Sequence, residues 1–299
     1  MKTAIAITLV ALSCLSGSIR TASAASDTLD KVKSTGTLSI GYREASIPFS
    51  YLGTDQKPVG FSLELCRALA QTIKTRLRLD KLDVQYVPVN ASNRIPLLQN
   101  GSIDIECGST TNTAERQKQV AFSVAIFVSQ PSWLVSIASG IKDANDLKGK
   151  TVVMTQGSLN VSLGQKINLD DKLDLQVAQT KDHGESLLMV RTGRASAWFE
   201  DNVLEAGMVA TAPDAAAFRF LPNSYGGYFY YGLMLRADDA SFKALVDDDL
   251  KARMASGEFA KLYATWFTQP IQPNGQNLAL PMSEALKTRI AAPSDALTP

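Results

Sequence analysis

The chain has 299 residues of ordinary globular composition, and its 30 basic side chains nearly balance its 29 acidic ones. It lacks a basic stripe with interleaved aromatic residues, so we expect no nucleic-acid partner. The chain has one histidine and three cysteines, which are few ligands for a Cys/His zinc site and few partners for a Cys–His nucleophile. We therefore expect no metal and no cofactor.

The first residues have the order of a secretory signal peptide. Lys2 supplies a positive start, residues 4–15 form an apolar run, and Ala22-Ser23-Ala24 is a small-x-small cleavage site. We therefore expect cleavage of residues 1–24, rather than lipid attachment at Cys14, and a location outside the cytoplasm for the mature chain. No later stretch reaches the roughly 18 consecutive apolar residues that a membrane span requires.

The mature chain first alternates strands and helices in the order β-α-β-α-β, which is typical of a parallel sheet with crossover helices. Such sheets bind ligands in the crevice beyond the carboxyl ends of their strands. In chain order, we expect a strand at 38–42, a loop with Pro48 and Gly53, a helix at 62–74, a strand at 84–89, a helix at 95–99 and a strand at 103–105.

The same alternation then starts again. In chain order, we expect a short helix at 143–147, a strand at 151–154, a helix at 157–166, a strand at 175–177, a helix at 185–192, a strand at 195–199, an extended apolar run at 228–235 and helices at 242–256 and 257–265. The extended run would return the chain to the first unit. The two chain crossings, near 127–129 and 228–231, are the predicted hinge.

Two similar units without a Pro/Gly-rich linker predict an α/β protein with two lobes. Each lobe is expected to be a mixed, mostly parallel sheet flanked by helices, and the lobes are joined by a two-strand hinge. We expect lobe 1 to be discontinuous, with residues 25–128 and 230–299, and lobe 2 to comprise residues 129–229.

Two cysteines remain after the predicted cleavage. Cys66 lies in the middle of a predicted helix and Cys107 at the end of a predicted strand. A disulfide would require their Cα atoms to lie within about 7 Å, which the sequence does not determine. Buried, unpaired thiols are the expected state, with a disulfide as the alternative.

Three arginines follow predicted strands of the first unit. Because strand ends on one sheet edge converge on one crevice, Arg43, Arg94 and Arg116 are expected to meet there, although a single loop arginine is usually a solvated surface group. Guanidinium groups suit planar, bidentate capture of carboxylates. Three of them would repel one another without an anion, so the sequence predicts an anionic ligand, which two carboxylates would suit.

Polar residues follow other predicted strands. Residues 108–112 precede a predicted helix and the pair Gly157-Ser158 opens another. Their hydroxyl and N–H groups can cap the helix and bind a carboxylate. Asp201 follows a strand of the second unit, where it can face an ammonium group or remain an exposed loop acid. His183 also follows a strand, although a lone histidine is more often structural.

Several segments resemble the periplasmic solute-binding proteins of polar amino acid ABC transporters, and within them the glutamate/aspartate-binding branch. The resemblance runs from about Leu29 to the end of the chain. The segments that carry it are Gly41–Tyr51, Asn93–Gly101, Glu106–Asn112, Glu115–Gln119, Lys181–Gly184 and Tyr231–Arg236.

The resemblance implies a type II-like binding-protein fold that closes on its ligand without chemistry. It implies that Ser109, Thr111 and Arg116 hold an α-carboxylate. By the same match, Arg43, Arg94 and His183 hold a side-chain carboxylate and Asp201 holds the α-ammonium. Ser158 is expected to join them from the second lobe. The implied partners are L-glutamate or L-aspartate and the permease subunits of an ABC importer, and the chain is expected to be a monomer.

Two residues depart from the branch. Ala91 stands where a serine is usual and Leu159 where a threonine is usual, so two hydroxyls are absent. Each lost hydrogen bond to a charged group costs about 1.5–3 kcal/mol if nothing replaces it. The choice between glutamate, aspartate and a related anion therefore stays open.

Two rival functions are considered. An enzyme resembling cyclohexadienyl dehydratase would use His183 or Glu200 as a general acid or base. A sensor ectodomain would need a membrane span or a signalling domain. The arginines and Asp201 account for an amino acid zwitterion without chemistry, so we expect no catalytic residue.

Overall fold

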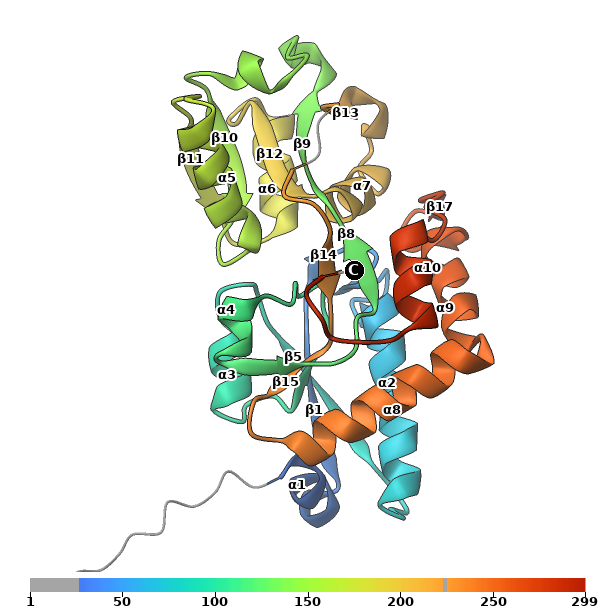
Figure 1. The fold of residues 1–299 in the computed structure, drawn as a ribbon. Coiled ribbons are helices and arrows are strands. Elements are labelled where there is room, and N and C mark those ends of the chain that lie inside the picture. The colour runs from blue at the N-terminus through green and yellow to red at the C-terminus, as the bar shows by residue number, and fades with distance from the viewer. Residues whose placement is uncertain (1–26, 223–224, 299) are drawn as a thin grey trace, which may run out of the picture.

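The computed structural model describes residues 27–222 and 225–298, which form two α/β lobes joined by a pair of strands (Figure 1). The predicted signal peptide, residues 1–24, lies outside the described residues. Within these two ranges, no helix has the length and apolar character needed to cross a membrane. The predicted fold class is confirmed.

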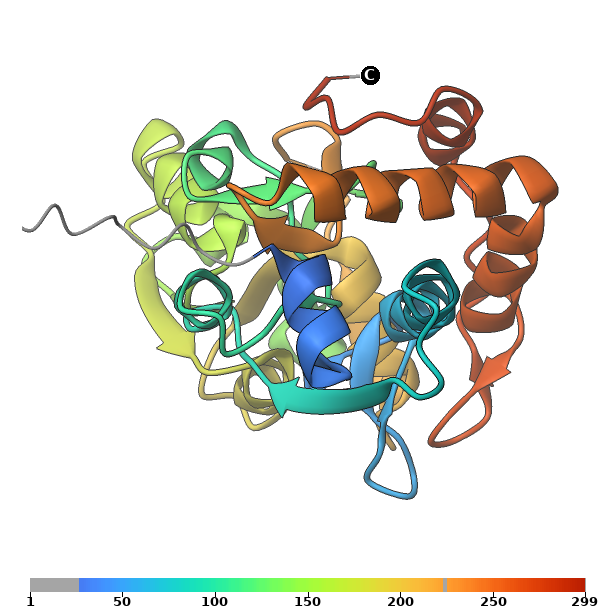
Figure 2. The same cartoon turned by 90° about the horizontal axis from the view of Figure 1, so that it is seen from below.

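The first lobe is built on a five-stranded sheet of order β5-β1-β6-β15-β7. β1 pairs in parallel with β5 and β6, and β15 pairs antiparallel with β6 and β7. Figure 2 shows the long helix α8 lying across this lobe beside α1 and α2. The strands of the sheet are β1 (Thr37–Tyr42), β5 (Asp83–Pro88), β6 (Ile105–Glu106), β7 (Val120–Phe122) and β15 (Met234–Arg236). The helices are α1 (Thr28–Thr35), α2 (Phe61–Arg76), α3 (Arg94–Gln99), α4 (Ala114–Gln117), α8 (Ala240–Ser256), α9 (Glu258–Phe267) and α10 (Glu284–Ala291).

The second lobe is built on a five-stranded sheet of order β11-β10-β12-β9-β13. β10 pairs in parallel with β11 and β12, whereas β9 pairs antiparallel with β12 and β13. The strands are β9 (Pro131–Ser136), β10 (Thr151–Thr155), β11 (Gln176–Thr180), β12 (Ala197–Asp201) and β13 (Phe218–Phe220). The helices are α5 (Leu159–Asp170), α6 (His183–Arg191), α7 (Asn202–Ala210) and the 3₁₀ turns η1 (Ile137–Ser139), η2 (Ala144–Leu147) and η3 (Ala215–Ala217).

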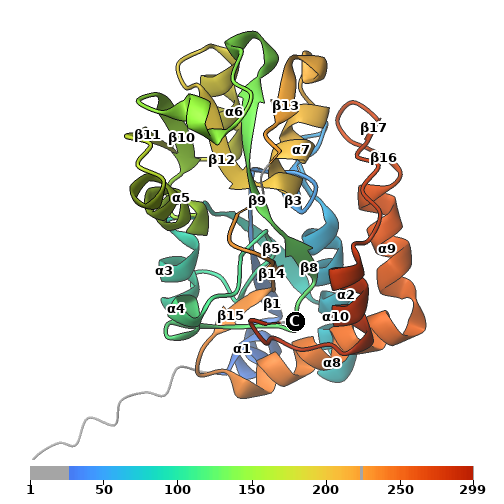
Figure 3. The same ribbon diagram turned by 45° about the horizontal axis from the view of Figure 1, so that its top comes forward.

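Two short strands connect the lobes. β8 (Phe127–Ser129) and β14 (Phe229–Tyr231) pair antiparallel, and Figure 3 shows them between the two sheets. They coincide with the two predicted chain crossings. A two-strand connection of this kind lets two rigid lobes rotate about a few backbone dihedrals.

Helix ends follow local sequence signals. Asp27 caps α1 by accepting a hydrogen bond from the N–H of Leu29, and Gly36 ends the helix in a left-handed conformation, which glycine adopts without steric cost. α8 ends in the same way at Gly257. Along α2, residues at helical spacing from Phe61 to Ile73 are buried and face the core of the first lobe.

An aromatic cluster lies where the first lobe meets the hinge. Phe127 of β8 lies 5.2 Å from Phe267 and 4.9 Å from Phe49, measured between ring centroids. Each fully buried aromatic side chain contributes about 1.5–3 kcal/mol to folding. The second lobe has a core of its own around Trp133 and Phe199, whose rings lie 4.5 Å apart. Each lobe therefore packs around its own interior.

Some local predictions are wrong. The segment with Pro48 and Gly53 is not a plain loop but a small antiparallel sheet of β2 (Ala45–Ser46), β3 (Ser50–Leu52) and β4 (Pro58–Val59). The expected run at 228–235 is two strands, because β14 pairs with β8 whereas β15 belongs to the first sheet. A last hairpin, β16 (Pro270–Ile271) with β17 (Gln276–Asn277), was also unpredicted.

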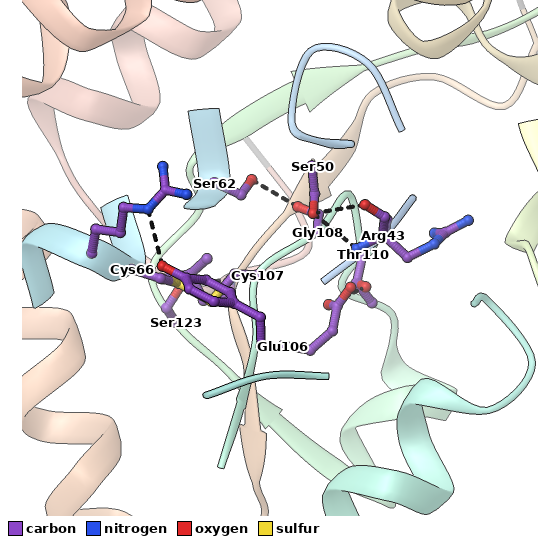
Figure 4. Close-up of a disulfide and its surroundings, with 12 residues drawn as sticks. Arg43, Ser50, Ser62, Cys66, Glu106, Cys107, Gly108, Thr110 and Ser123 are labelled. Atoms are coloured by element: carbon purple, nitrogen blue, oxygen red, sulfur yellow. Dashed lines mark hydrogen bonds between the residues drawn. A yellow bond between two sulfur atoms is a disulfide. The ribbon is translucent and has the colours of Figure 1, made fainter. Parts of the chain in front are cut away.

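The expectation of unpaired thiols is also wrong. Cys66 of α2 and Cys107, which follows β6, form a disulfide with a Cα–Cα distance of 6.4 Å (Figure 4). The sequence could not show that α2 packs against the end of β6. The hydroxyl of Ser62 also donates to the carbonyl of Gly108 at 2.8 Å. The disulfide and this bond fasten the start of segment 108–112 to α2.

Candidate functional site

A pocket lies between the two lobes, and all eight residues predicted from the sequence line it. It encloses about 260 Å³ of unfilled space, counting open solvent at its mouth. The predicted residues that line it are Arg43, Arg94, Ser109, Thr111, Arg116, Ser158, His183 and Asp201. The other lining residues are Ala91, Leu159, Asn160, Glu200 and Leu204.

The three arginines reach this pocket from different elements of the first lobe. Arg43 follows β1, Arg94 is the first residue of α3, and Arg116 lies in α4. Arg43 and Arg94 are buried, whereas Arg116 is partly buried at the rim. Because the strands that precede them end at one sheet edge, their guanidinium groups converge as predicted.

Desolvation makes this cluster of positive charge costly. Burial, and then the nearby Arg94, lower the pKa of Arg43 to about 10 and that of Arg116 to about 9. Burial also lowers the pKa of Arg94, although Glu106 and Glu200 oppose the shift. A bound anion would restore favourable interactions for all three groups.

Internal hydrogen bonds hold two of the three guanidinium groups in place. Nη1 of Arg94 donates to the hydroxyl of Thr110 at 2.6 Å, and that hydroxyl donates to Glu106 at 2.6 Å. Nη1 of Arg116 donates to the carbonyl of Thr111 at 2.8 Å. The guanidinium groups of Arg94 and Arg116 therefore enter the pocket in a fixed orientation.

Several buried polar atoms of the pocket lack a hydrogen-bond partner within the described ranges. More than nine in ten buried polar groups in native proteins are hydrogen-bonded, so a cluster of exceptions points to a ligand that satisfies them. The lining atoms concerned are Arg43 Nη2, Arg94 Nε, Ser109 Oγ, Ser158 Oγ, Asn160 Oδ1 and Glu200 Oε2. Donors and acceptors are both present, which suits a zwitterion.

The start of α5 faces the pocket from the second lobe. Ser158 is its N-cap residue, but its hydroxyl makes no capping bond. Leu159 and Asn160, in the first helical turn, also line the pocket. The unpaired N–H groups and the helix dipole at such an end favour a negative group. Segment 108–112 does not cap a helix as the sequence suggested, because the N-cap residue of α4 is Thr113.

Asp201 enters at the end of β12 and is buried. The hydroxyl of Tyr231, on the hinge strand β14, donates to its Oδ2, and the amide of Asn160 lies 3.4 Å from its Oδ1. Burial raises the pKa of Asp201, whereas these two hydrogen bonds lower it. A positively charged group in the pocket would favour its carboxylate form.

His183 begins α6 and packs against Trp198, with 5.8 Å between ring centroids. Its Nδ1 lies 3.1 Å from the carbonyl oxygen of Ala45 and 3.3 Å from the hydroxyl of Ser46, both in β2 of the first lobe. Burial and the charge of Arg43 hold its pKa well below 6.5. The histidine is therefore neutral and links the lobes.

The lobes touch on both sides of the pocket. Nη2 of Arg116 donates to the carbonyl of Gly157 at 3.2 Å, and the hydroxyl of Ser92 donates to the carbonyl of Gln156 at 3.2 Å. On the other side, Gly207 of α7 packs against the backbone of Ile47. The structure is therefore a closed arrangement of the two lobes.

Four important residues were not among the predicted site residues. Asn160, Glu200 and Leu204 line the pocket, and Tyr231 supports Asp201. Asn160 was detectable in principle, because it lies two residues after Ser158 at a predicted helix start. Tyr231 was predicted as part of the hinge at 228–231, but nothing in the sequence indicated that its hydroxyl would bond to Asp201.

A larger groove runs along the hinge and encloses about 1000 Å³ by the same measure. Phe127, Tyr263 and Phe220 contribute aromatic walls, and no charged side chain lines it. It is therefore unsuited to the anionic ligand that the arginines favour. Across residues 27–222 and 225–298, no group of His, Cys, Asp and Glu side chains could hold a metal ion.

Two lobes, a two-strand hinge and a charged pocket between them define a two-lobed solute-binding protein. The chain belongs to family 3 of the bacterial extracellular solute-binding proteins, whose sequence pattern matches residues 38–269. It is 48% identical over 271 residues to the L-glutamate/L-aspartate-binding protein of Pseudomonas aeruginosa, covering 90% of this chain and 89% of that protein. It is 41% identical over 297 residues to the glutamate/aspartate import solute-binding protein of Escherichia coli, covering 98% and 97%. The resemblance found in the sequence is confirmed.

Solved structures have the same fold. An ancestral arginine-binding protein bound to arginine matches with a TM-score of 0.68 and 29% identity, covering 78% of this chain and 98% of that one. An ancestral amino acid-binding protein that is a precursor of cyclohexadienyl dehydratase matches with a TM-score of 0.66 and 27% identity, covering 81% and 100%. The curated relatives are named as binding proteins, so the dehydratase alternative is not favoured.

Proposed function

We propose that this chain is the solute-binding component of an ABC importer and that it binds L-glutamate or L-aspartate between its lobes. One observation carries the proposal: three guanidinium groups and one buried aspartate line the same enclosed pocket. An acidic amino acid offers two carboxylates and one ammonium group to these partners. The names of the similar import proteins support the same ligand class.

The assignment of groups follows charge and position. Arg116, Ser109 and Thr111 bind the α-carboxylate, and Asp201 binds the α-ammonium. The side-chain carboxylate is bound by Arg43 and Arg94 and lies beside the ring of neutral His183, and Ser158 contributes from the start of α5. Burial between the lobes removes competing water, which strengthens each of these charged hydrogen bonds.

The rest of the proposal concerns setting and partners. The chain acts in the periplasm as a monomer after removal of residues 1–24, delivers its ligand to permease subunits and catalyses no reaction. Residues 25–128 and 230–299 form lobe 1 and residues 129–229 form lobe 2, because the paired strands β8 and β14 lie at these boundaries.

Isothermal titration of the purified protein against L-glutamate, L-aspartate, L-glutamine and L-asparagine tests this function. Both acidic ligands, or one of them, are expected to bind at least about tenfold more tightly than their amides, because an amide leaves buried guanidinium N–H groups without a charged partner. Tighter binding of an amide, or no binding of either acidic ligand, would refute the proposal.

Lobe closure leads to a prediction at Gly207. A Cβ atom at this position would overlap the carbonyl oxygen of Ile47 and lie 2.7 Å from its carbonyl carbon. Gly207 lies within α7, where alanine is ordinarily more favourable than glycine, so Gly207→Ala should not destabilise the lobe itself. It should keep the lobes apart and weaken L-glutamate binding by at least about tenfold, since a ligand can favour the closed form only by its extra affinity for it.

Gly184→Ala is the matched control in the same lobe. Gly184 is also helical, and its nearest neighbour would lie 3.3 Å from an added Cβ, which is tolerable. This variant should bind as the unaltered protein does. Equal affinity of the Gly207→Ala variant, measured by titration with thermal unfolding as the check on folding, would show that closure at Ile47 is not required.

A further inference from the structure

Glu200 is a buried acid to which the proposed ligand contacts assign no role. It lies on β12 directly before Asp201, is 1% exposed and lines the pocket. Its Oε1 accepts hydrogen bonds from the amide of Asn160 and, at 3.2 Å, from the backbone N–H of Asp201. Its Oε2 has no hydrogen-bond partner among the described residues and lies 3.7 Å from Nε2 of His183.

The state of His183 constrains the state of Glu200. A carbonyl oxygen can only accept a hydrogen bond, so the contact with Ala45 places a proton on Nδ1 of the imidazole. In a neutral ring, Nε2 then carries a lone pair directed at the pocket. A lone pair facing an ionised Oε2 at 3.7 Å would be repulsive. A proton on Oε2 removes that repulsion and leaves both side chains neutral.

Other charges around this pair come from both lobes. Arg43, Arg94 and Arg116 are the positive groups, and they act on the pair from the first lobe. Three nearby acidic groups belong to the second lobe. Asp201 and Glu205 are close to Glu200, and Asp182 directly precedes His183. Burial holds the pKa of Glu205 well above 4.5, and Glu205 lies outside the pocket lining. Asp182 is partly exposed to water.

The proton decides the charge balance of the pocket. With Glu200 protonated, the Glu200–His183 pair is neutral, and the three guanidinium groups exceed the carboxylates of Glu106 and Asp201 by one positive charge. An acidic amino acid carries one net negative charge at neutral pH, which matches this excess. Without the proton, the pocket has no excess charge and would suit a ligand with no net charge.

We propose that Glu200 is a specificity-determining residue, which stays protonated beside neutral His183 and thereby matches the net charge of the pocket to an acidic amino acid. The proposal rests on the proposed function. It assigns Glu200 a role in ligand choice rather than in catalysis, since no bond of the ligand changes. Burial, followed by the neighbouring Asp201, raises the pKa of Glu200 to about 8, which is consistent with a carboxyl that is neutral at pH 7.

The proposal predicts how the affinity for L-glutamate changes with pH. As the pH rises through about 8, Glu200 loses its proton in the free protein, and binding an acidic amino acid then requires taking it up again. Affinity for L-glutamate should therefore be constant below that pH and fall above it. Between pH 7 and pH 9 the expected loss is about tenfold, because one proton is coupled to one binding event.

The test compares the unaltered protein with Glu200→Gln by titration with L-glutamate at pH 7, 8 and 9. The amide keeps the shape and stays neutral, so Glu200→Gln should bind at pH 7 and show little of the alkaline loss. Changes that arise from the arginines or from the amino group of the ligand affect both proteins equally. Glu205→Gln is the matched control, because Glu205 is equally buried but outside the pocket lining, and it should keep the full pH dependence.

A second measurement needs no variant. Titration of the unaltered protein at pH 8.5 in buffers of different ionisation enthalpy reports the protons taken up on binding, which should be more than half a proton per ligand. Constant affinity from pH 7 to pH 9, or no proton uptake, would overturn the role of Glu200 while leaving the ligand assignment intact. Absence of L-glutamate binding at pH 7 would overturn both.

Discussion

Replacing Asp201 with asparagine is expected to weaken L-glutamate binding at least about a hundredfold, because it removes the only anionic partner that we assign to the α-ammonium group. The side chain is 3% exposed, so water cannot replace the lost charge. Glutarate, which has both carboxylates but no ammonium, should lose little affinity and is the informative second ligand. Titration of both ligands separates loss of one charge pair from general damage to the pocket.

The free protein should tolerate this change. Asp201 lies next to Glu200, and two adjacent buried carboxyls oppose each other's ionisation, so an amide relieves that conflict. The asparagine can still accept the hydrogen bond from Tyr231. The thermal midpoint should therefore not fall, and an equal loss of glutarate and glutamate affinity would contradict the assignment of Asp201 to the amine.

Arg43→Ala is expected to have an effect of similar size at the other end of the ligand. Arg43 is 2% exposed, and Nη2 of its guanidinium has no partner within the described chain, so the substitution removes a ligand contact without breaking an internal bond to that atom. Loss of one member of a buried charge pair costs about 3–5 kcal/mol, which is a hundredfold or more in affinity.

The loss should depend on the ligand. The affinity for L-glutamate should fall most. The affinity for L-glutamine, which lacks the side-chain carboxylate, should fall much less, so the ratio of the two affinities should decrease. Arg191→Ala is the matched control, because Arg191 pairs with Asp214 on the surface of the second lobe. Equal weakening of glutamate and glutamine in calorimetric titration would contradict a contact between Arg43 and the side-chain carboxylate.

Much of the fold could be predicted because hydrophobic periodicity and chain order are local. The strands at 38–42 and 151–154 and the helix at 62–74 lie within the structural elements β1, β10 and α2. The small sheet β2–β4 escaped prediction because its strands have only two or three residues, too few to show an alternation. The disulfide joins Cys66 of α2 to Cys107, which lies 41 residues further along the chain, and no local pattern reports that contact.

Some of the site residues could also be predicted from the sequence, whereas others could not. Arg43, Arg94 and Arg116 could be placed together because the carboxyl ends of parallel strands meet at one edge. Glu200 could not be placed with Asp201, since neighbouring residues of a regular strand point to opposite faces. Both line the pocket here because β12 ends at Asp201, which is also the N-cap residue of α7. The binding roles of the eight predicted residues stay predictions.

A crystal structure of the protein with L-glutamate tests the central claim most directly. We predict the ligand between the closed lobes, with its ammonium group within hydrogen-bonding distance of Asp201 and its two carboxylates on separate guanidinium groups, the distal one near Arg43. Density for glutamate outside this pocket, or with its amine directed away from Asp201, would contradict the account.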